Sequence, residues 1–599
     1  MVTAAAAGEP TTLAEIHAAL AEIDTGSLPP WRIAVLRNIT VETIEPFLRF
    51  HAARAGLKAE LRFGEFDNIV QEALGAGDPT LLANADCVLV FLKLELFSSG
   101  LAAGFAALDP AELAAEKAQI ENELATVLQG IRTQTQGMVL LHAFEMPADP
   151  AYGSLDASFA GGQIRFYQKL NTSLREQCAE QAGCYVVDTQ SLAQRMGFDR
   201  WYDRRFWSMG RAPYSGLAME ALAREQVKFF SAQSGAQKKC LVLDCDNTLW
   251  GGIVGEDGVS GIKLSNDHPG SAYKRFQHEV QGLAKRGVIL AICSKNNAED
   301  VWEVFDNHPD MVLTRDDIAA ARINWDDKAA NIQSIVAELN IGMNSVVFID
   351  DSDFELDFVQ TALPEITIIQ FPAKSPVNAE GMLTRLGLFD TLTVSAEDRK
   401  RGEMYNAERQ RKETAGSAVS LEAYYASLEM IAEVQAIDDF ALLRATQLTQ
   451  KTNQFNLTTH RYSEDEVRTF IERDNAAGLY IRVKDRFGDY GIVGIALIET
   501  DGDTAVIDTF LLSCRALGRG VEDLLLSETL RAAEQLGAAV VSAEYIPTEK
   551  NRQTEKFYPD RGFATDPDAD GNKYFYNLEQ GIPTRPDAFK EIRSDLSEC

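Results

Sequence analysis

The chain has 599 residues, of which 46% are hydrophobic and 24% are charged, and its formal net charge is −32. A chain of this length exceeds a single hydrophobic core, so three or four soluble globular domains are expected. The negative charge argues against nucleic acid or an anionic membrane as the main partner, and no apolar run approaches the roughly 18 residues of a membrane span.

The cysteines and the start of the chain indicate the cellular compartment. The eight cysteines are scattered without C-x-x-C spacing, which is typical of reduced thiols in a cytoplasmic protein. The Ala-rich start lacks the basic region of a secretory signal, and Glu9 interrupts it. We therefore expect residues 1–29 to form a helical or disordered segment of a cytoplasmic protein.

Residues 30–235 alternate strand-like apolar runs with helical patterns, which predicts an independent α/β domain. The strand-like runs are residues 33–36, 61–63, 88–92, 138–141 and 185–187. Their order resembles the SGNH hydrolase fold. The nucleophilic serine of that family should follow the first strand, but residues 36–40 contain no serine, and Asp188 begins no Asp-x-x-His motif. We expect a non-hydrolytic domain that serves for packing or for docking a partner.

A further strand-like run, residues 241–243, leads into Asp244 and Asp246, with Thr248 two residues further on. Buried strands of parallel sheets have this pattern, and ligands gather beyond their carboxyl ends. Two neighbouring carboxylates repel each other unless a cation lies between them, and oxygen ligands favour Mg²⁺. A D-x-D pair alone also fits a helix N-cap or an Asx turn, so the downstream residues decide.

Three downstream positions supply matching chemistry. The apolar run 287–293 ends in Ser294, Lys328 starts a helical pattern, and the run 345–349 ends in Asp350 and Asp351. The gaps between them suit strand–helix–strand units of at least roughly 30 residues. Over residues 236–395, the order and types of these residues resemble the haloacid dehalogenase (HAD) superfamily of phosphotransferases.

The resemblance to HAD enzymes implies a role for each residue. Asp244 matches the nucleophile that forms an aspartyl-phosphate, and Asp246 matches the acid/base that protonates the leaving oxygen. The side chains expected to bind phosphoryl oxygens are Thr248, Ser294, Asn296 and Lys328. The Mg²⁺ ligands implied by the resemblance are Asp244, Asp246 through its main-chain oxygen, Asp350 and Asp351.

The short segment between Asp246 and Ser294 leaves little room for a large cap domain. An open site of this kind needs another element to exclude water. The Trp-Gly-Gly segment 250–252 and a neighbouring domain are the candidates for that cover.

The C-terminal third has a different glycine-containing motif. Residues 396–425 are charged and helical in pattern, which predicts a helical connector. Within 426–599, Arg515, Gly518 and Gly520 form an R-x-x-G-x-G segment between a strand-like and a helical run. Main-chain N–H groups at a helix N-terminus suit a pyrophosphate. With Asn551 and residues 557–563, this loop resembles the coenzyme A-binding region of GNAT acyltransferases.

SGNH-like, HAD-like and GNAT-like domains in one α/β chain resemble the FkbH-like family. The strings that carry the match are residues 249–258, 294–297, 450–458, 512–515 and 520–522. The family dephosphorylates 1,3-bisphosphoglycerate and loads a D-glyceryl group onto the phosphopantetheine thiol of an acyl carrier protein, for polyketide-type or related biosynthesis. In that case the Arg515, Gly518 and Gly520 loop would hold the pantetheine phosphate rather than coenzyme A.

The residue that carries the acyl group is left open. Cys514 precedes the phosphate-binding loop, where a helix N-terminus would lower its pKa. Cys293 precedes Ser294, but strand alternation should turn it into the core, and Cys245 is also expected in the core. The alternatives are transfer through Cys514, transfer through Cys293 and direct transfer.

Three other functions also remain open. The chain could be a stand-alone phosphatase of small phosphomonoesters, a GNAT-type acyltransferase with a scaffold HAD domain, or a non-catalytic module that binds carrier proteins. The complete set of HAD motif residues argues against the last two.

Overall fold

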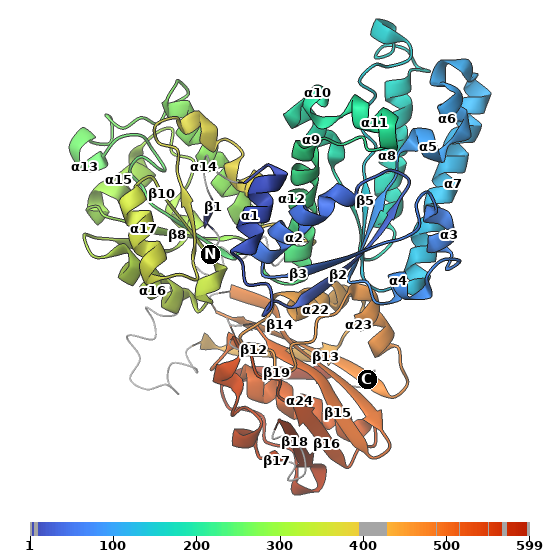
Figure 1. Cartoon of the computed structure of the whole chain (residues 1–599). Coiled ribbons are helices and arrows are strands. Elements are labelled where there is room, and N and C mark those ends of the chain that lie inside the picture. Colours follow the sequence, from blue (N-terminus) through green and yellow to red (C-terminus); the bar gives the residue numbers. More distant parts are fainter. Residues whose placement is uncertain are drawn as a thin grey trace. The chain divides into compact units, whose positions relative to one another are not determined.

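The protein is described here by a computed structural model covering residues 3–4, 10–393, 428–486, 488–513, 516–548, 550–565 and 572–595. The chain divides into two compact units, Gly8–Ser231 and Met1–Ala7 with Ala232–Cys599 (Figure 1). Helices accompany a parallel sheet in the first unit and a parallel and a mixed sheet in the second, which confirms the α/β prediction. Among the described residues, no helix has the length and apolar character needed to cross a membrane.

The first unit is built on a parallel sheet with the strand order β3-β2-β4-β5-β6. Its strands are β2 (Pro30–Arg37), β3 (Lys58–Phe63), β4 (Cys87–Phe91), β5 (Met138–His142) and β6 (Cys184–Val187). All five match strand-like runs of the sequence. The helices are α1 (Leu13–Ala21), α2 (Glu45–Arg54), α3 (Ile69–Ala73), α4 (Pro79–Ala83), α5 (Leu94–Phe97), α6 (Ser99–Ala103), α7 (Pro110–Gln134), α8 (Gln163–Ala179), α9 (Thr189–Met196), α10 (Phe198–Trp201), α11 (Arg204–Gly210) and α12 (Gly216–Gln233).

A buried ion pair lies near the carboxyl ends of the strands in this unit. The Lys93 ammonium lies 3.0 Å from the Glu145 carboxylate, which also accepts a 3.3 Å hydrogen bond from the Trp201 indole. Asn38, the first residue after β2, exchanges two hydrogen bonds with the main chain of Lys93. Asp188 caps α9 by accepting from the Ser191 amide. The expected non-hydrolytic role of this unit stays a prediction.

The second unit contains a parallel sheet with the order β1-β11-β10-β7-β8-β9. The strands are β1 (Thr3–Ala4), β7 (Cys240–Leu243), β8 (Ile289–Ser294), β9 (Ile318–Ile323), β10 (Val346–Asp350) and β11 (Thr367–Gln370). The helices are α13 (Val254–Asp257), α14 (Gly270–Lys285), α15 (Ala298–Asn307), α16 (Lys328–Leu339), α17 (Asp353–Ala362) and α18 (Met382–Leu386). Strand β1 pairs with β11, so part of the segment expected to be helical or disordered extends this sheet.

Strand β7 is buried on both faces, and its alternation divides the core in two. Leu241 and Leu243 pack in one cluster with residues of α14 and α15, whereas Cys240 and Val242 pack in another with residues of α16 and α17. Because successive side chains of a strand point to opposite faces, a continuous apolar run is needed here. Only the four-residue helix α13 lies between β7 and α14, which agrees with the expected small or absent cap.

The same unit contains a mixed sheet with the order β17-β18-β16-β15-β14-β13-β12-β19. The strands are β12 (Met430–Ala436), β13 (Ala476–Asp485), β14 (Gly488–Asp501), β15 (Thr504–Leu512), β16 (Val540–Glu544), β17 (Ala564–Thr565), β18 (Lys573–Asn577) and β19 (Phe589–Asp595). The helices are α22 (Asp439–Lys451), α23 (Glu464–Ile471) and α24 (Val521–Gln535). Helix α24 packs in one core cluster of this sheet, and α22 and α23 pack in the other. The predicted connector, residues 396–425, lies entirely outside the described residues.

His142, at the end of β5, makes the first unit sensitive to acid. Its Nδ1 lies 2.8 Å from the Val90 oxygen and its Nε2 lies 2.7 Å from the Gln226 amide nitrogen, which fits a neutral ring. Burial lowers the pKa of His142 to about 4. An unfolded chain takes up this proton near pH 6.5, so the unfolded state binds more protons between about pH 6.5 and 4. The contribution of this neutral ring to stability is therefore lost as the pH falls through that range.

We predict that His142→Gln flattens the pH dependence of local stability in β5. The protection of the β5 amides against hydrogen–deuterium exchange, expressed relative to the intrinsic exchange rate at each pH, should fall from pH 7 to pH 5 more in the wild type than in the variant. His17→Gln, at an exposed position on α1, is the matched control and should follow the wild type. An equal pH response in His142→Gln and the wild type would contradict the assignment.

Candidate functional site

Asp244 and Asp350 are brought together by strand pairing. Strand β7 ends at Leu243, whose partner in the parallel neighbour β10 is Ile349. The next residue in each strand is therefore a carboxylate, and the Asp244 amide donates to the Ile349 oxygen at 3.0 Å. The strand order reverses direction at β7, because β10 lies on one side and β8 on the other. The carboxyl edge at such a switch point is where open α/β sheets bind ligands.

Lys328 links these two carboxylates. It is the first residue of α16, whose N-cap Asp327 accepts from the Ala330 amide. The Lys328 ammonium donates to Asp244 Oδ1 at 2.9 Å and to Asp350 Oδ2 at 2.5 Å, and all three side chains are buried. Burial alone would lower the pKa of Lys328, but the two carboxylates outweigh burial and raise that pKa.

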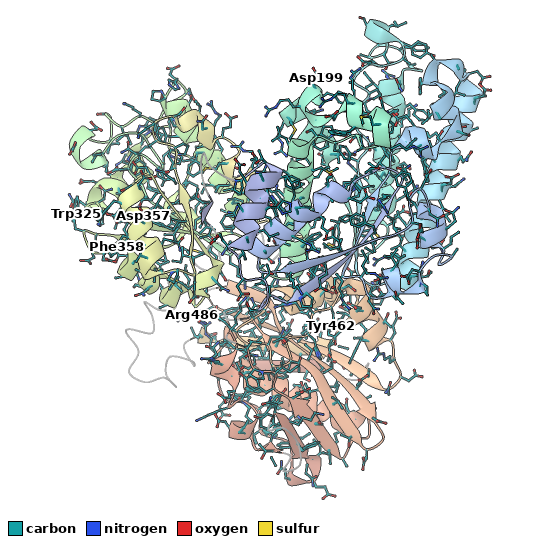
Figure 2. All side chains as sticks on the ribbon, viewed as in Figure 1. Asp199, Trp325, Asp357, Phe358, Tyr462 and Arg486 are labelled. Atoms are coloured by element: carbon teal, nitrogen blue, oxygen red, sulfur yellow. The ribbon has the colours of Figure 1, made fainter. Side chains whose placement is uncertain are left out.

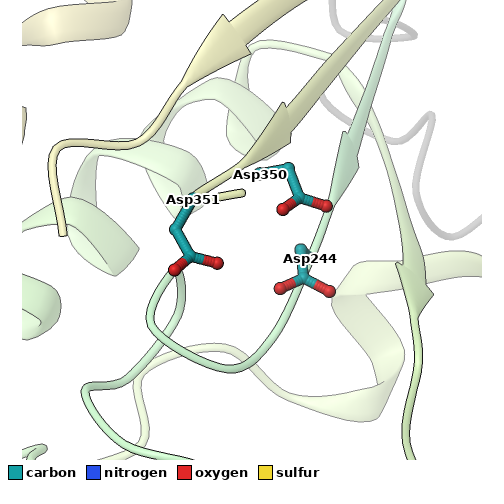
Figure 3. A group of neighbouring side chains, drawn as sticks. All are labelled: Asp244, Asp350 and Asp351. Atoms are coloured by element: carbon teal, nitrogen blue, oxygen red, sulfur yellow. The ribbon is translucent and has the colours of Figure 1, made fainter. Parts of the chain in front are cut away.

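The carboxylates carry more negative charge than Lys328 balances. Burial and the neighbouring Asp244 raise the pKa of Asp350 to about 6, and burial and Asp350 raise the pKa of Asp351 to about 6. Burial also raises the pKa of Asp244. Oxygen atoms of Asp244, Asp350 and Asp351 lie within 4.8 Å of one another (Figure 3). Three clustered carboxylate oxygens are the hard ligands that Mg²⁺ prefers, so this donor set fits the ion.

Asp246 is held apart from this trio by its own loop. Its Oδ1 accepts from the Trp250 indole at 2.8 Å and from the Val254 amide at 3.0 Å, and its Oδ2 accepts from the Asn296 amide at 3.1 Å. The carboxylate is therefore fixed in orientation by three donors. The Mg²⁺ role expected for Asp246 concerns its main-chain oxygen, which these bonds leave untouched.

The loop that holds Asp246 depends on special backbone conformations. Asn247 has a φ of 54° and accepts from the Gly252 amide, and Gly252 itself has a φ of 97°. Gly251 pairs with Lys263 across an isolated bridge, and a Cβ at Gly251 would lie 2.8 Å from the Tyr273 ring. Trp250 is fully buried in the core beneath the loop. The Trp-Gly-Gly segment thus orients Asp246, and Trp250 is a core anchor rather than the expected cover.

Further side chains expected to bind phosphoryl oxygens lie at the same edge. Ser294 ends β8, and Asn296 donates to both the Ser294 hydroxyl at 3.0 Å and the Asp246 carboxylate. The Thr248 hydroxyl is buried and has no hydrogen-bond partner among the described residues. A buried hydroxyl without a partner can donate a hydrogen bond to a ligand oxygen. Trp325, in the loop before Lys328, is 70% exposed (Figure 2).

The cysteines near this site are unsuited to carry an acyl group. Cys245 and Cys293 are buried in the core, as expected, and strand alternation had predicted this for Cys293. Burial raises the pKa of the Cys293 thiol to about 12, and burial also raises that of Cys245. A neutral thiol is a poor nucleophile. The alternative of acyl transfer through Cys293 therefore loses its chemical basis.

The predicted pantetheine loop lies on the other sheet of this unit. Cys514 and Arg515 fall outside the described residues, whereas Ser513 directly follows β15. Gly518 and Gly520 have φ angles of 73° and 81°, and Gly520 caps α24. The Gly518 amide donates to the Glu522 carboxylate at 3.1 Å. One of the amides expected to bind a phosphate thus already has an anionic partner, which the sequence pattern did not reveal.

A segment of the chain itself lies between β15 and β16 beyond their paired part. These strands pair in parallel only over residues 504–507 and 540–543. Further along, Leu457 donates to Phe510 and accepts from Ile546, and Phe455 accepts from Leu512. Asn551 fixes the segment by donating to the Asn456 oxygen at 3.0 Å. Residues 455–457, part of the string 450–458 noted in the sequence, therefore have a structural role.

No family model and no curated protein matches the chain, but several solved structures are similar to parts of it. The N-terminal part of BF1531 from Bacteroides fragilis, which contains a phosphatase domain and was crystallised with Mg, is 27% identical with a TM-score of 0.57. The alignment covers 64% of this chain and 99% of that one.

Two acetyltransferases match smaller parts of the chain. The ribosomal-protein-S18-alanine N-acetyltransferase of Escherichia coli is 14% identical over 26% of this chain and 97% of its own, with a TM-score of 0.19. The GNAT domain of S. lividans PAT is 20% identical over 24% of this chain and 89% of its own, with a TM-score of 0.20. TM-scores of this size do not establish that the mixed sheet shares a fold with these acetyltransferases.

The carboxylate trio predicts a measurable Mg²⁺ site. Asp350→Asn should weaken Mg²⁺ binding in isothermal titration calorimetry by at least about tenfold, since even outer partners of metal ligands are worth about 10–100-fold. Asp357→Asn, at an exposed position on α17 (Figure 2), is the matched control and should bind Mg²⁺ as the wild type does. Unchanged affinity in Asp350→Asn would remove Asp350 from the ligand set.

Proposed function

We propose that the chain is a Mg²⁺-dependent phosphatase with an aspartate nucleophile that also acts as a glyceryl transferase. The observation that carries the phosphatase half is the buried arrangement of Asp244, Lys328 and Asp350 beside a separately oriented Asp246. The likeness to a phosphatase-domain protein crystallised with Mg supports the same reaction. The transferase half rests on the strings shared with the FkbH-like family.

In the first step Asp244 attacks phosphorus. A carboxylate oxygen of Asp244 forms a bond to the phosphorus of the phosphomonoester, and the bond to the leaving oxygen breaks. Asp246, as the protonated acid, gives its proton to that oxygen, so the product leaves as an alcohol. The three donors on Asp246 fix the direction in which its proton can be delivered.

In the second step the aspartyl-phosphate is hydrolysed. Asp246, now a carboxylate, takes a proton from water as the water oxygen attacks phosphorus, and inorganic phosphate leaves with Asp244 restored. Lys328 would neutralise charge on the phosphoryl oxygens, and the buried hydroxyls of Ser294 and Thr248 would donate to them. When bound by Asp244, Asp350 and Asp351, Mg²⁺ supplies further positive charge at the phosphoryl group.

The acyl half uses chemistry that needs no further activation. In 1,3-bisphosphoglycerate the carboxyl group is an acyl phosphate, so a thiolate can attack its carbonyl carbon, form a thioester and release phosphate. We propose Cys514 as the first thiol and the phosphopantetheine of an acyl carrier protein as the final acceptor, with Arg515, Gly518 and Gly520 at the pantetheine phosphate. The product would enter polyketide-type or related biosynthesis in the cytoplasm.

The two catalytic aspartates should respond differently to substitution. Asp244→Asn should reduce phosphate release to background, because an amide cannot form the aspartyl-phosphate. Asp246→Asn should lower turnover by about 10²–10⁴-fold, the usual contribution of a general acid–base group. Phosphate release from 3-phosphoglycerate, measured with Asp357→Asn as the control, checks both. Substantial turnover in Asp244→Asn would contradict the nucleophile assignment.

Carrier loading tests the transferase half. A cognate holo carrier protein incubated with enzyme, Mg²⁺ and 1,3-bisphosphoglycerate should gain one glyceryl group by mass spectrometry. Cys514→Ala should abolish the gain and leave phosphatase activity intact. If the wild type releases phosphate from many monoesters but never acylates a carrier, the chain is a stand-alone phosphatase. If Cys514→Ala still loads the carrier, the transfer is direct.

A further inference from the structure

A cavity lies at the opposite edge of the parallel sheet from Asp244. It has a volume of about 410 Å³. One wall consists of residues 237–239 before β7, residues 286–289 before and at the start of β8, and residues 340–345 before β10. The other wall comes from the mixed sheet and α22, at residues 444, 448, 451–454 and 513. Because all three strands run in parallel from this edge to the phosphatase edge, the two sites are separated by the length of the sheet.

The cavity is strongly basic in a chain that is strongly acidic. Among the described lining residues, six are cationic and only Glu365 is acidic, although the chain as a whole has a net charge of −32. The cations are Lys238, Lys239, Arg286, Arg444, Lys451 and Lys550. Such a concentration of one charge within a concave surface attracts ions of the opposite sign.

The cavity brings Lys238 close enough to Lys550 for their charges to interact. The Lys239 ammonium donates to the Lys451 main-chain oxygen at 2.8 Å, which joins the walls directly. The Lys238 ammonium donates to the Asn344 oxygen at 2.7 Å, and Arg286 lies 3.7 Å from Asp390. Burial and the neighbouring Lys550 lower the pKa of Lys238 to about 8. An anion in the cavity would relieve this repulsion and stabilise Lys238 in its charged form.

One polar atom at the cavity points to a hydroxyl on the ligand. The side-chain oxygen of Gln237 is buried and has no hydrogen-bond partner among the described residues. Leaving such an acceptor buried and unpaired is unfavourable. A ligand hydroxyl would satisfy it, whereas the cations would hold phosphate oxygens.

We propose that this cavity binds a small hydroxylated organic phosphate at a site separate from the phosphatase centre. Its volume is in the range of about 300–1,000 Å³ that is usual for small-molecule sites. A phosphorylated hydroxy acid and a phosphopantetheine arm share this chemistry. The site goes beyond the proposed function, and it would exist even if the chain had no transferase activity.

Calorimetry can separate this site from the phosphatase centre. We would titrate 3-phosphoglycerate, 4′-phosphopantetheine and inorganic phosphate into full-length Asp244→Asn without Mg²⁺, so that the monoesters stay intact. The same titrations follow in that background with Arg286→Gln and Lys550→Gln added together. Lys285→Gln is the matched control, because Lys285 precedes Arg286 but does not line the cavity.

The expected result is that at least one organic phosphate binds tenfold or more tightly than inorganic phosphate. The double substitution should weaken this binding at least tenfold, Lys285→Gln should leave it unchanged, and higher salt should weaken it. The organic phosphate that binds identifies the source of the ligand. Unfolding temperatures check the fold, and the single Lys550→Gln, at an exposed position, provides the same comparison if the double variant is destabilised.

Three outcomes would overturn the proposal. They are the absence of binding for all three probes at millimolar concentration, equal affinity for inorganic and organic phosphates, and unchanged binding in the double variant. If the wild type has no phosphatase activity, the proposed function is wrong. The proposal for this cavity is unaffected, because the titrations use a protein that lacks the nucleophile.

Discussion

The buried ammonium of Lys328 between Asp244 and Asp350 is the interaction on which the candidate site depends. Two carboxylates out of water repel each other, and one cation makes their burial tolerable. The balance remains negative once Asp351 is included. A divalent cation can balance that remaining negative charge. Two features hold this arrangement. The register of β7 against β10 brings the carboxylates together, and the capped start of α16 positions Lys328.

The parallel sheet of this unit has two chemically distinct edges. Its carboxyl edge concentrates carboxylates around one lysine, and its amino edge faces a cavity lined by six cations. The net charge of −32 describes neither edge. Local electrostatics therefore decide ligand preference at each edge, and the overall charge bears only on the rest of the surface.

Sequence patterns predicted the elements whose information is local. The strands of the first unit, and β7, β8 and β10, are short apolar runs, and burial on both faces requires such runs. The expectation that Cys293 faces the core also follows from strand alternation. The role of Trp250 could not be predicted, because a tryptophan in a glycine-containing loop gives no sign of whether it covers the site or anchors it. Its indole bond to Asp246 becomes visible only in three dimensions.

By itself, the sequence determined the α/β class, the strands and the order of carboxylate, hydroxyl, lysine and carboxylate along the chain, because each is set by residues near one another. Tertiary structure alone decided which groups meet. In the folded chain Lys328 contacts two carboxylates, and the Gly518 amide donates to Glu522. Cations from positions 238 to 550 line one cavity. Contacts between residues so far apart in sequence depend on strand order and on the packing of two sheets, which no local pattern records.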